Sequence, residues 1–133
     1  MRIKEETVAA IVKEASEKMS DPNYSAVLVG SFVQQQGPTA QYLGSHADDF
    51  GGPEAVVNAI FHCALMAECF KKANNRSIRS MSFDQLNAVS DGDRQERLTK
   101  RQPALVSYLE MNVEDEPMRH VLALIALAMD WVA

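Results

Sequence analysis

The residues best suited to chemistry lie in one stretch, YLGSHADDFGGP, which covers residues 42–53. It brings His46 close to Asp48 and Asp49, and His62 follows in the next segment. A histidine beside two carboxylates could bind a divalent metal or carry out acid/base catalysis. One hypothesis is therefore a ligand- or metal-binding helical enzyme that uses His46, Asp48 and Asp49.

The spacing of these residues differs from that of known metal sites. The sequence has no HExxH, CxxC or EF-hand pattern, and no Glu-x-x-His pair of the kind that di-iron bundles use. Carboxylates near a helix start are favoured by the helix dipole, by about 0.3–1 kcal/mol each. We therefore interpret Asp48 and Asp49 as acids that launch a buried helix and His46 as a linker residue, and we predict neither a bound metal nor a cofactor.

The two cysteines, Cys63 and Cys69, fall in one helical segment. They would lie about 9 Å apart along its axis and about 120° around it, so they could not bond to each other. His62 adjoins Cys63 but would point about 100° away, and a buried helical cysteine is usually inert. No GxSxG, Walker or GxGxxG motif is present. The interpretation favours a non-enzymatic protein, with free thiols that suit a reducing compartment.

Composition sets broader bounds. A chain of 133 residues with 47% hydrophobic and 23% charged residues is typical of one globular domain. Glutamates at positions 5 and 6 argue against a secretory signal, and the longest apolar run, Val121 to Met129, is far shorter than the roughly 20 residues that cross a bilayer. The net charge of −5 argues against non-specific nucleic-acid binding. We expect a cytoplasmic protein without a membrane segment.

Helical periodicity dominates the chain, and no long segment alternates with period two. The expected helices cover residues 3–19, 22–36, roughly 38–44, 53–75, 83–90, 94–101, 104–111 and 118–132. In the 53–75 helix, the predicted buried stripe holds Val57, Ile60, Phe61, Ala64 and Leu65, with His62 in a more polar sector. The last helix is apolar on almost every side, which predicts a central helix or a subunit interface. The fold prediction is all-α: a compact bundle of about five to seven helices.

Two segments resemble each other. Residues 32–49 align with 98–115 at an offset of 66, and deleting Phe50 and Gly51 extends the match. The aligned pairs include Gln36 with Gln102, Tyr42 with Tyr108, Asp49 with Asp115, Pro53 with Pro117 and Ala59 with Ala123. This predicts an internal repeat, about 32–66 and 98–130, of two helical units about a pseudo-twofold axis. Two amphipathic helix pairs with similar caps could also match this well by chance.

Charge is unevenly distributed. Residues 71–101 hold eight Lys/Arg against four acids, so this segment is +4 and the remainder −9. Such asymmetry can mark a docking surface, although pairing with acidic helices of the same chain would also explain it. The candidate binding residues are Arg76, Arg79, Arg94, Arg97, Lys100 and Arg101.

The functional hypothesis is an interaction protein of the adaptor, inhibitor or immunity type, whose partner is another protein or a second copy in a homodimer. Another hypothesis is a regulator that contacts nucleic acid through the basic segment 71–101. Few aromatic residues accompany its cations, and helix-turn-helix spacing is missing, which argues against nucleic acid.

Overall fold

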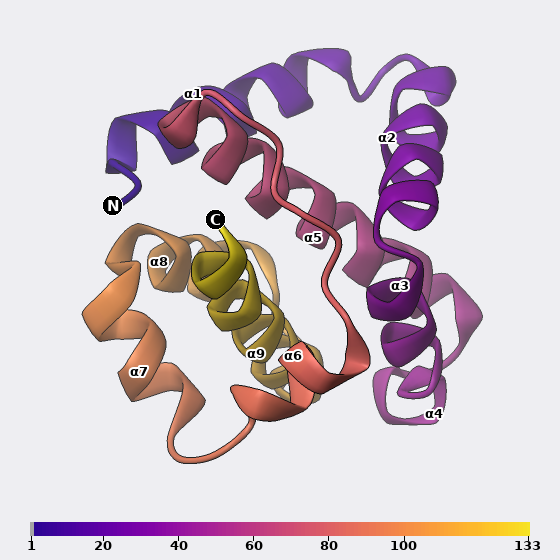
Figure 1. Ribbon diagram of the computed structural model, residues 1–133. Coiled ribbons are helices and arrows are strands. Elements are labelled where there is room, and N and C mark those ends of the chain that lie inside the picture. The colour runs from indigo at the N-terminus through magenta and orange to yellow at the C-terminus, as the bar shows by residue number, and fades with distance from the viewer. Residues whose placement is uncertain (1) are drawn as a thin grey trace.

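The computed structural model describes residues 2–133, which form helices joined by turns and contain no strand (Figure 1). The described helices are α1 (Glu5–Lys18), α2 (Pro22–Gln35), α3 (Gly37–Gly44), α4 (Ala47–Phe50), α5 (Pro53–Asn74), α6 (Phe83–Ala88), α7 (Arg94–Arg101), α8 (Pro103–Asn112) and α9 (Glu116–Val132). The all-α prediction is confirmed: the described residues form nine helices, which roughly fits the expected bundle of about five to seven. One unforeseen helix is α4, a single turn between α3 and α5.

The residues Ser82–Gln85 match the capping-box pattern, Asp93–Glu96 match a variant of it, and Asp115 precedes Glu116 and Pro117, so the sequence predicts a helix start at each of these three places. The structure has a side-chain cap at all three. Ser82 and Gln85 form a reciprocal capping box at the start of α6, because each side chain binds the backbone N–H of the other. The side chain of Asp93 accepts from a backbone N–H in the first turn of α7, and that of Asp115 does the same for α9. These bonds satisfy N–H groups that a helix start otherwise leaves unpaired.

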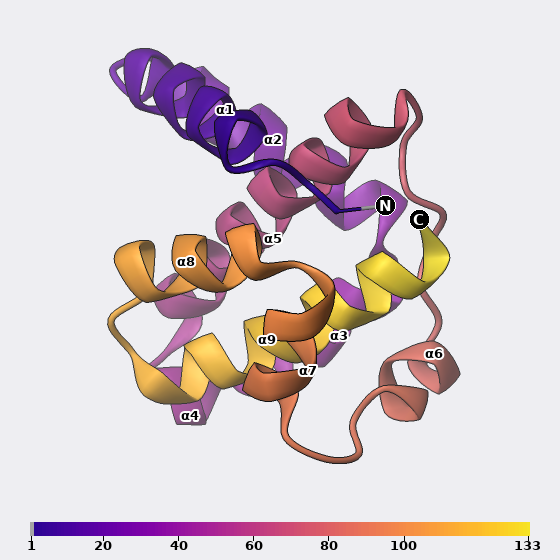
Figure 2. The ribbon, with the colours of Figure 1, turned by 90° about the vertical axis from the view of Figure 1, so that its left-hand side faces the viewer.

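Helix α9 is the centre of the molecule. It packs against α4, α5, α6, α7 and α8, and it runs through the middle of the view in Figure 2. From Val121 to Met129 every side chain is buried. The predicted central position is therefore confirmed, and the apolar surface of α9 is used within one chain. Trp131, near its C-terminal end, is an exception, with 56% of its surface exposed.

Helix α5 is the second core element, and its buried surface differs from the predicted stripe. Ile60, Ala64 and Leu65 are buried as expected, but Val57 is 52% exposed. His62, which the sequence places in the polar sector, is buried, with only 9% of its surface exposed. The reason is tertiary: α1, α2, α3 and α9 all contact α5, so its buried surface is wider than one stripe. Val57 instead lines a depression between α2 and α5.

Two buried glutamines stand at equivalent helix joints. Gln36 lies between α2 and α3, and Gln102 lies between α7 and α8. Each donates its backbone N–H to the carbonyl four residues earlier, at 2.7 Å in both cases. The aligned residues thus have the same local backbone role, while the internal repeat itself stays a prediction.

The side chains of these glutamines hold extended segments from the opposite half of the chain. The Oε1 atom of Gln36 accepts from the N–H of Met81 at 2.9 Å, just before α6. The Oε1 atom of Gln102 accepts from the N–H of Ile3 at 2.8 Å, just before α1. A buried N–H without a partner is costly, so each amide fixes the path of a segment that has no helical bonds of its own.

Candidate functional site

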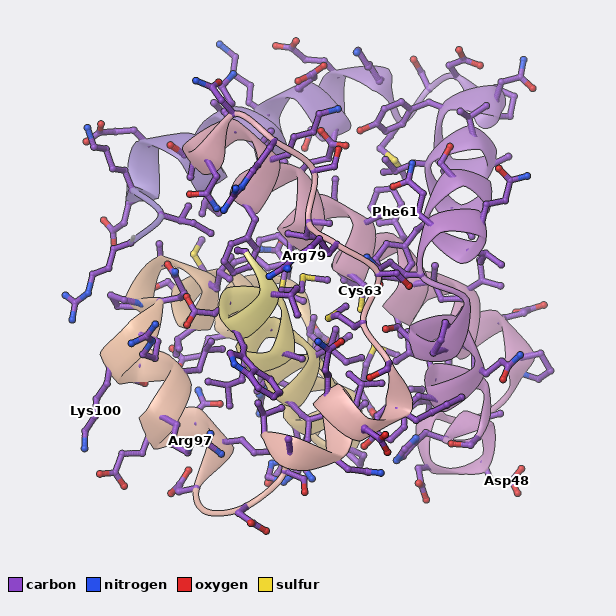
Figure 3. The ribbon with its side chains drawn as sticks, viewed as in Figure 1. Asp48, Phe61, Cys63, Arg79, Arg97 and Lys100 are labelled. Carbon is purple, nitrogen blue, oxygen red and sulfur yellow. The ribbon has the colours of Figure 1, made fainter. Side chains whose placement is uncertain are left out.

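The histidine–aspartate stretch does not form a compact site. His46 places its Nδ1 atom 2.9 Å from the carbonyl oxygen of Tyr42, and its ring stacks on Phe50. Asp48 and Asp49 are exposed, and Figure 3 shows Asp48 at the edge of the molecule. These acids lie in the first turn of α4, not at the start of α5. The N-cap of α5 is Gly52, so no side chain caps that helix. The prediction that they launch the long helix is wrong, because Gly51 in a left-handed conformation ends α4 first.

Within residues 2–133, no three His, Cys, Asp or Glu side chains come together in an arrangement that could hold a metal ion. Cys63 and Cys69 are free and buried. Burial raises the pKa of Cys69 to about 12, and it raises the pKa of Cys63 further above its usual range. Both thiols therefore keep their protons near neutral pH, where a nucleophile would have to lose one.

A buried pair of ring side chains joins α5 to α8: His62 on α5 contacts Tyr108 on α8. Its Nδ1 atom lies 2.7 Å from the hydroxyl oxygen of Tyr108, and the two rings meet edge to face. Burial lowers the pKa of His62 and raises that of Tyr108, so both are neutral at pH 7. The neutral pair can share this bond in two ways: with the His62 proton on Nε2, Tyr108 donates to Nδ1, and with the proton on Nδ1, His62 donates to the hydroxyl oxygen of Tyr108.

A basic surface groove lies where α7, α9 and the end of α5 meet. Two adjoining depressions, of about 610 and 690 Å³, share Arg101, Asp130 and Trp131. We call their union the Trp131 groove. Its other residues are Ala88, Val89, Arg97, Lys100 and Leu127 on one side and Phe70, Ala73, Asn74, Asn75, Arg76 and Ala133 on the other. An exposed tryptophan therefore divides a groove that has both apolar and cationic walls.

The carboxylate of Asp130 organises the groove floor. Its side chain is only 9% exposed, and it accepts from Nε of Arg101 at 2.8 Å and from Nε2 of Gln102 at 2.8 Å. Gln102 also holds the N–H of Ile3, so the groove floor is bonded to the joint between α7 and α8 and to the N-terminal segment. Through its bond to Asp130, Arg101 is connected to this network, although its side chain is 63% exposed.

The remaining cations of the groove differ in how firmly they are held. Arg97 donates to the carbonyl oxygens of Val89 and Asp91 and closes the loop between α6 and α7. Lys100 makes a 3.4 Å contact with Glu96 along α7, and its side chain is 73% exposed and points outward in Figure 3. Exposed pairs of this kind contribute about 0.5 kcal/mol or less. Lys100 and the exposed Arg76 can therefore turn toward a ligand at little cost.

Of the six candidate cations, four line the Trp131 groove: Arg76, Arg97, Lys100 and Arg101. Arg79 instead donates to the carbonyl oxygen of Val132 at 3.3 Å, near the end of α9. Arg94 is the first residue of α7 and lines neither depression. Sequence reasoning missed Asp130 and Trp131, although the polar and amphipathic pair at the end of an otherwise apolar helix is a signal that could have indicated them.

Comparisons with known protein families, with curated proteins and with solved structures found no match. Within residues 2–133, no helix combines the length and the apolar character that a bilayer crossing requires. What can be said of function therefore comes from the surfaces described above.

Proposed function

We propose that this chain is a non-enzymatic interaction module that binds an acidic segment of a partner protein in the Trp131 groove. The observation that carries the proposal is the exposure of Trp131, at 56%, between two depressions that share Arg101. Tryptophan and arginine are the residue types most enriched among the energetically dominant positions of protein interfaces. A tryptophan left half in water offers apolar area that a partner can still bury.

The charges of the groove support an acidic ligand. Arg76, Arg97, Lys100 and Arg101 surround it, and the carboxylate of Asp130 already binds Arg101 and Gln102. The rest of the chain outside residues 71–101 carries −9, so the groove is the positive part of an acidic molecule. Such a distribution orients an acidic partner and repels it from other faces.

The groove also has apolar residues beside its charges, which favours a peptide ligand over a simple anion. Leu127, Ala88 and Val89 line one side of the groove, and Phe70 and Ala73 line the other. The fitting ligand carries carboxylates next to an apolar side chain that covers the indole. We place this function in the cytoplasm, because a reducing compartment suits the free thiols Cys63 and Cys69.

The test uses Trp131 as its own reporter, because the chain contains one tryptophan. We expect a short peptide of glutamate and aspartate around a central leucine to shift the Trp131 emission to shorter wavelength and to bind less tightly as salt is added. The charge-reversed lysine peptide should leave the emission unchanged. Binding of the acidic peptide without any change at Trp131 would contradict the groove.

A pair of variants separates the groove from net charge. Arg76→Glu with Lys100→Glu should weaken binding of the labelled acidic peptide at least about tenfold in fluorescence anisotropy. The matched control is Lys4→Glu with Lys13→Glu, which changes the charge equally on exposed positions at α1. Equal losses in both pairs would mean that only net charge matters. Tighter binding of a single-stranded oligonucleotide than of the peptide would favour the nucleic-acid regulator instead.

A further inference from the structure

Helix α2 is an exposed apolar ridge. It covers 14 residues, and among them only Phe32 is buried, although Tyr24, Leu28 and Val29 pack partly against the core. Its outer side leaves Val27 66% and Val33 40% exposed. Of the described large apolar side chains that are exposed, these two form the only pair on one helix.

The stretch that contains α2 carries no charge. All 13 Lys/Arg and all 18 Asp/Glu residues lie outside residues 22–47, so this surface is neutral in a chain of net charge −5. A depression beside α2 is rimmed by the cations Lys18 and Lys71 and the anions Asp21 and Glu68. The neutral centre and the balanced rim match the anatomy of protein interfaces, which exclude charge from the core and keep it at the edge.

The outer side of α2 is arranged symmetrically about Gly30. Val27 lies three residues before this glycine and Val33 three residues after it. At 100° per residue, the two valines fall about 60° to either side of Gly30 on the helix surface. A Cβ added at Gly30 would meet no atom within 4 Å, so the chain's own packing does not require a glycine here. Because Gly30 has no side chain and lies between two valines, another helix can approach the α2 backbone closely at this point.

We propose that α2 is the interface of a homodimer, in which the two α2 helices cross at Gly30. A twofold interface brings a surface against its own copy, so that surface must complement itself. A face with strong charge of one sign would repel its copy, whereas the α2 face brings no charge to the centre. In the depression that contains Val27, it brings equal numbers of both signs to the rim. The partner is therefore a second copy of this chain.

This interface is separate from the Trp131 groove. Helix α2 lies at the right of Figure 1, and α7, which carries Arg97 and Lys100, lies at the left. No groove residue belongs to α2. The inference does not rest on the proposed function, and the two can fail independently: a dimer without peptide binding would reject the groove alone, and a monomer that binds the peptide would reject the dimer alone.

Analytical ultracentrifugation over ~1–300 µM gives the first test, since specific contacts have dissociation constants in or below this range. The native chain should sediment with twice its 14.7 kDa mass. Val27→Glu with Val33→Glu places like charges at the centre of the interface and should return the mass to that of one chain. Both positions are exposed, so the circular dichroism spectrum should not change.

The matched control is Met111→Glu, at an 83% exposed apolar position on α8, which should leave the dimer intact. A native chain that sediments as a monomer throughout the range would overturn the proposal, including the case in which a different protein covers α2. A dimer that survives both glutamates would show that another surface forms it and would overturn the proposal equally.

Cross-linking tests the crossing point directly. A residue at a twofold axis meets its own copy, so Gly30→Cys should form an interchain disulfide under mild oxidation. The native Cys63 and Cys69 are buried and should not compete. Met111→Cys serves as the exposed control and should remain a monomer on a non-reducing gel. Failure of the Gly30→Cys chain to cross-link, or equal cross-linking of the control, would overturn the α2 contact.

Discussion

The joints at Gln36 and Gln102 share a backbone geometry but serve different surroundings. The amide of Gln36 binds only backbone groups, the carbonyl oxygen of Arg79 and the N–H of Met81. The amide of Gln102 has the backbone N–H of Ile3 and the carboxylate of Asp130 among its partners. The first joint therefore only fixes a chain path, whereas the second joint also fixes the floor of the Trp131 groove. The two joints therefore have a similar backbone, but only the joint at Gln102 is bonded to a charged side chain, that of Asp130.

The helices before these joints differ in the same way. Helix α2, before Gln36, has no charged residue and exposes Val27 and Val33. Helix α7, before Gln102, reads RQERLTKR and buries only Leu98. Helices at corresponding positions thus present opposite surfaces, one apolar and neutral, the other charged. Two helices that precede similar joints can therefore present very different surfaces to the solvent.

The largest expected difference between the joints is in stability. Gln102→Leu should lower the free energy of unfolding by about 3 kcal/mol, because it leaves the N–H of Ile3 unpaired and removes a partner from the carboxylate of Asp130. Gln36→Leu should lower the free energy of unfolding by about 2 kcal/mol, since it leaves only backbone groups without their partner. Urea unfolding measures both. An equal or larger loss at Gln36 would remove the distinction between the two joints.

A smaller effect is expected one turn into the following helices, where Thr39 in α3 aligns with Leu105 in α8. Both are 0% exposed, and the hydroxyl of Thr39 has no hydrogen-bond partner among the described residues. Thr39→Val should therefore raise the free energy of unfolding by about 1 kcal/mol. The reverse exchange, Leu105→Thr, should lower it by about 2 kcal/mol. Destabilisation by Thr39→Val in thermal unfolding would show that this hydroxyl is paired.

The third difference concerns pH. His62 in α5 aligns with Ala126 in α9, so only the first half has a titrating group here. Burial lowers the pKa of His62 below its ordinary 6.5, while the partner Tyr108 stays neutral. The unfolded chain then binds the proton more readily, so this contribution to stability is present above pH 6.5 and is lost as pH falls through the folded pKa.

His62→Gln should remove this part of the pH dependence. Between about pH 7.5 and about pH 5.5, the melting temperature of the native chain should fall further than that of the variant. Identical slopes for the native chain and His62→Gln would exclude His62 as the source.

Much of the fold could be read from local patterns. The cap at Ser82, the cap at Asp93 and the helix start at Asp115 each depend on residues within one turn, so sequence alone predicted them. The apolar character of α9 likewise predicted either a central helix or a subunit interface, and its packing within the chain shows that it is central. The buried stripe of α5 was predicted only in part, because the exposure of Val57 and the burial of His62 depend on which helices arrive from elsewhere in the chain.

The candidate site was less accessible to sequence reasoning. The basic segment indicated Arg76, Arg97, Lys100 and Arg101, because charge asymmetry is visible in composition. It could not show that α9 supplies Trp131, which lies 30 residues beyond Arg101 in the chain, or that Asp130 pairs with that arginine at 2.8 Å. Such pairs form only when separate helices pack.

The sequence by itself determined the helices other than the single turn α4, three of their capped starts, the apolar centre and the segregation of positive charge, since each follows from residues near one another in the chain. The tertiary structure alone decided that Gln36 and Gln102 hold segments from the opposite half, that His62 is buried against Tyr108, and that Trp131 stands among the cations. The physical reason is range: caps and amphipathic faces are set within a few residues, whereas burial and polar pairing depend on packing between distant segments.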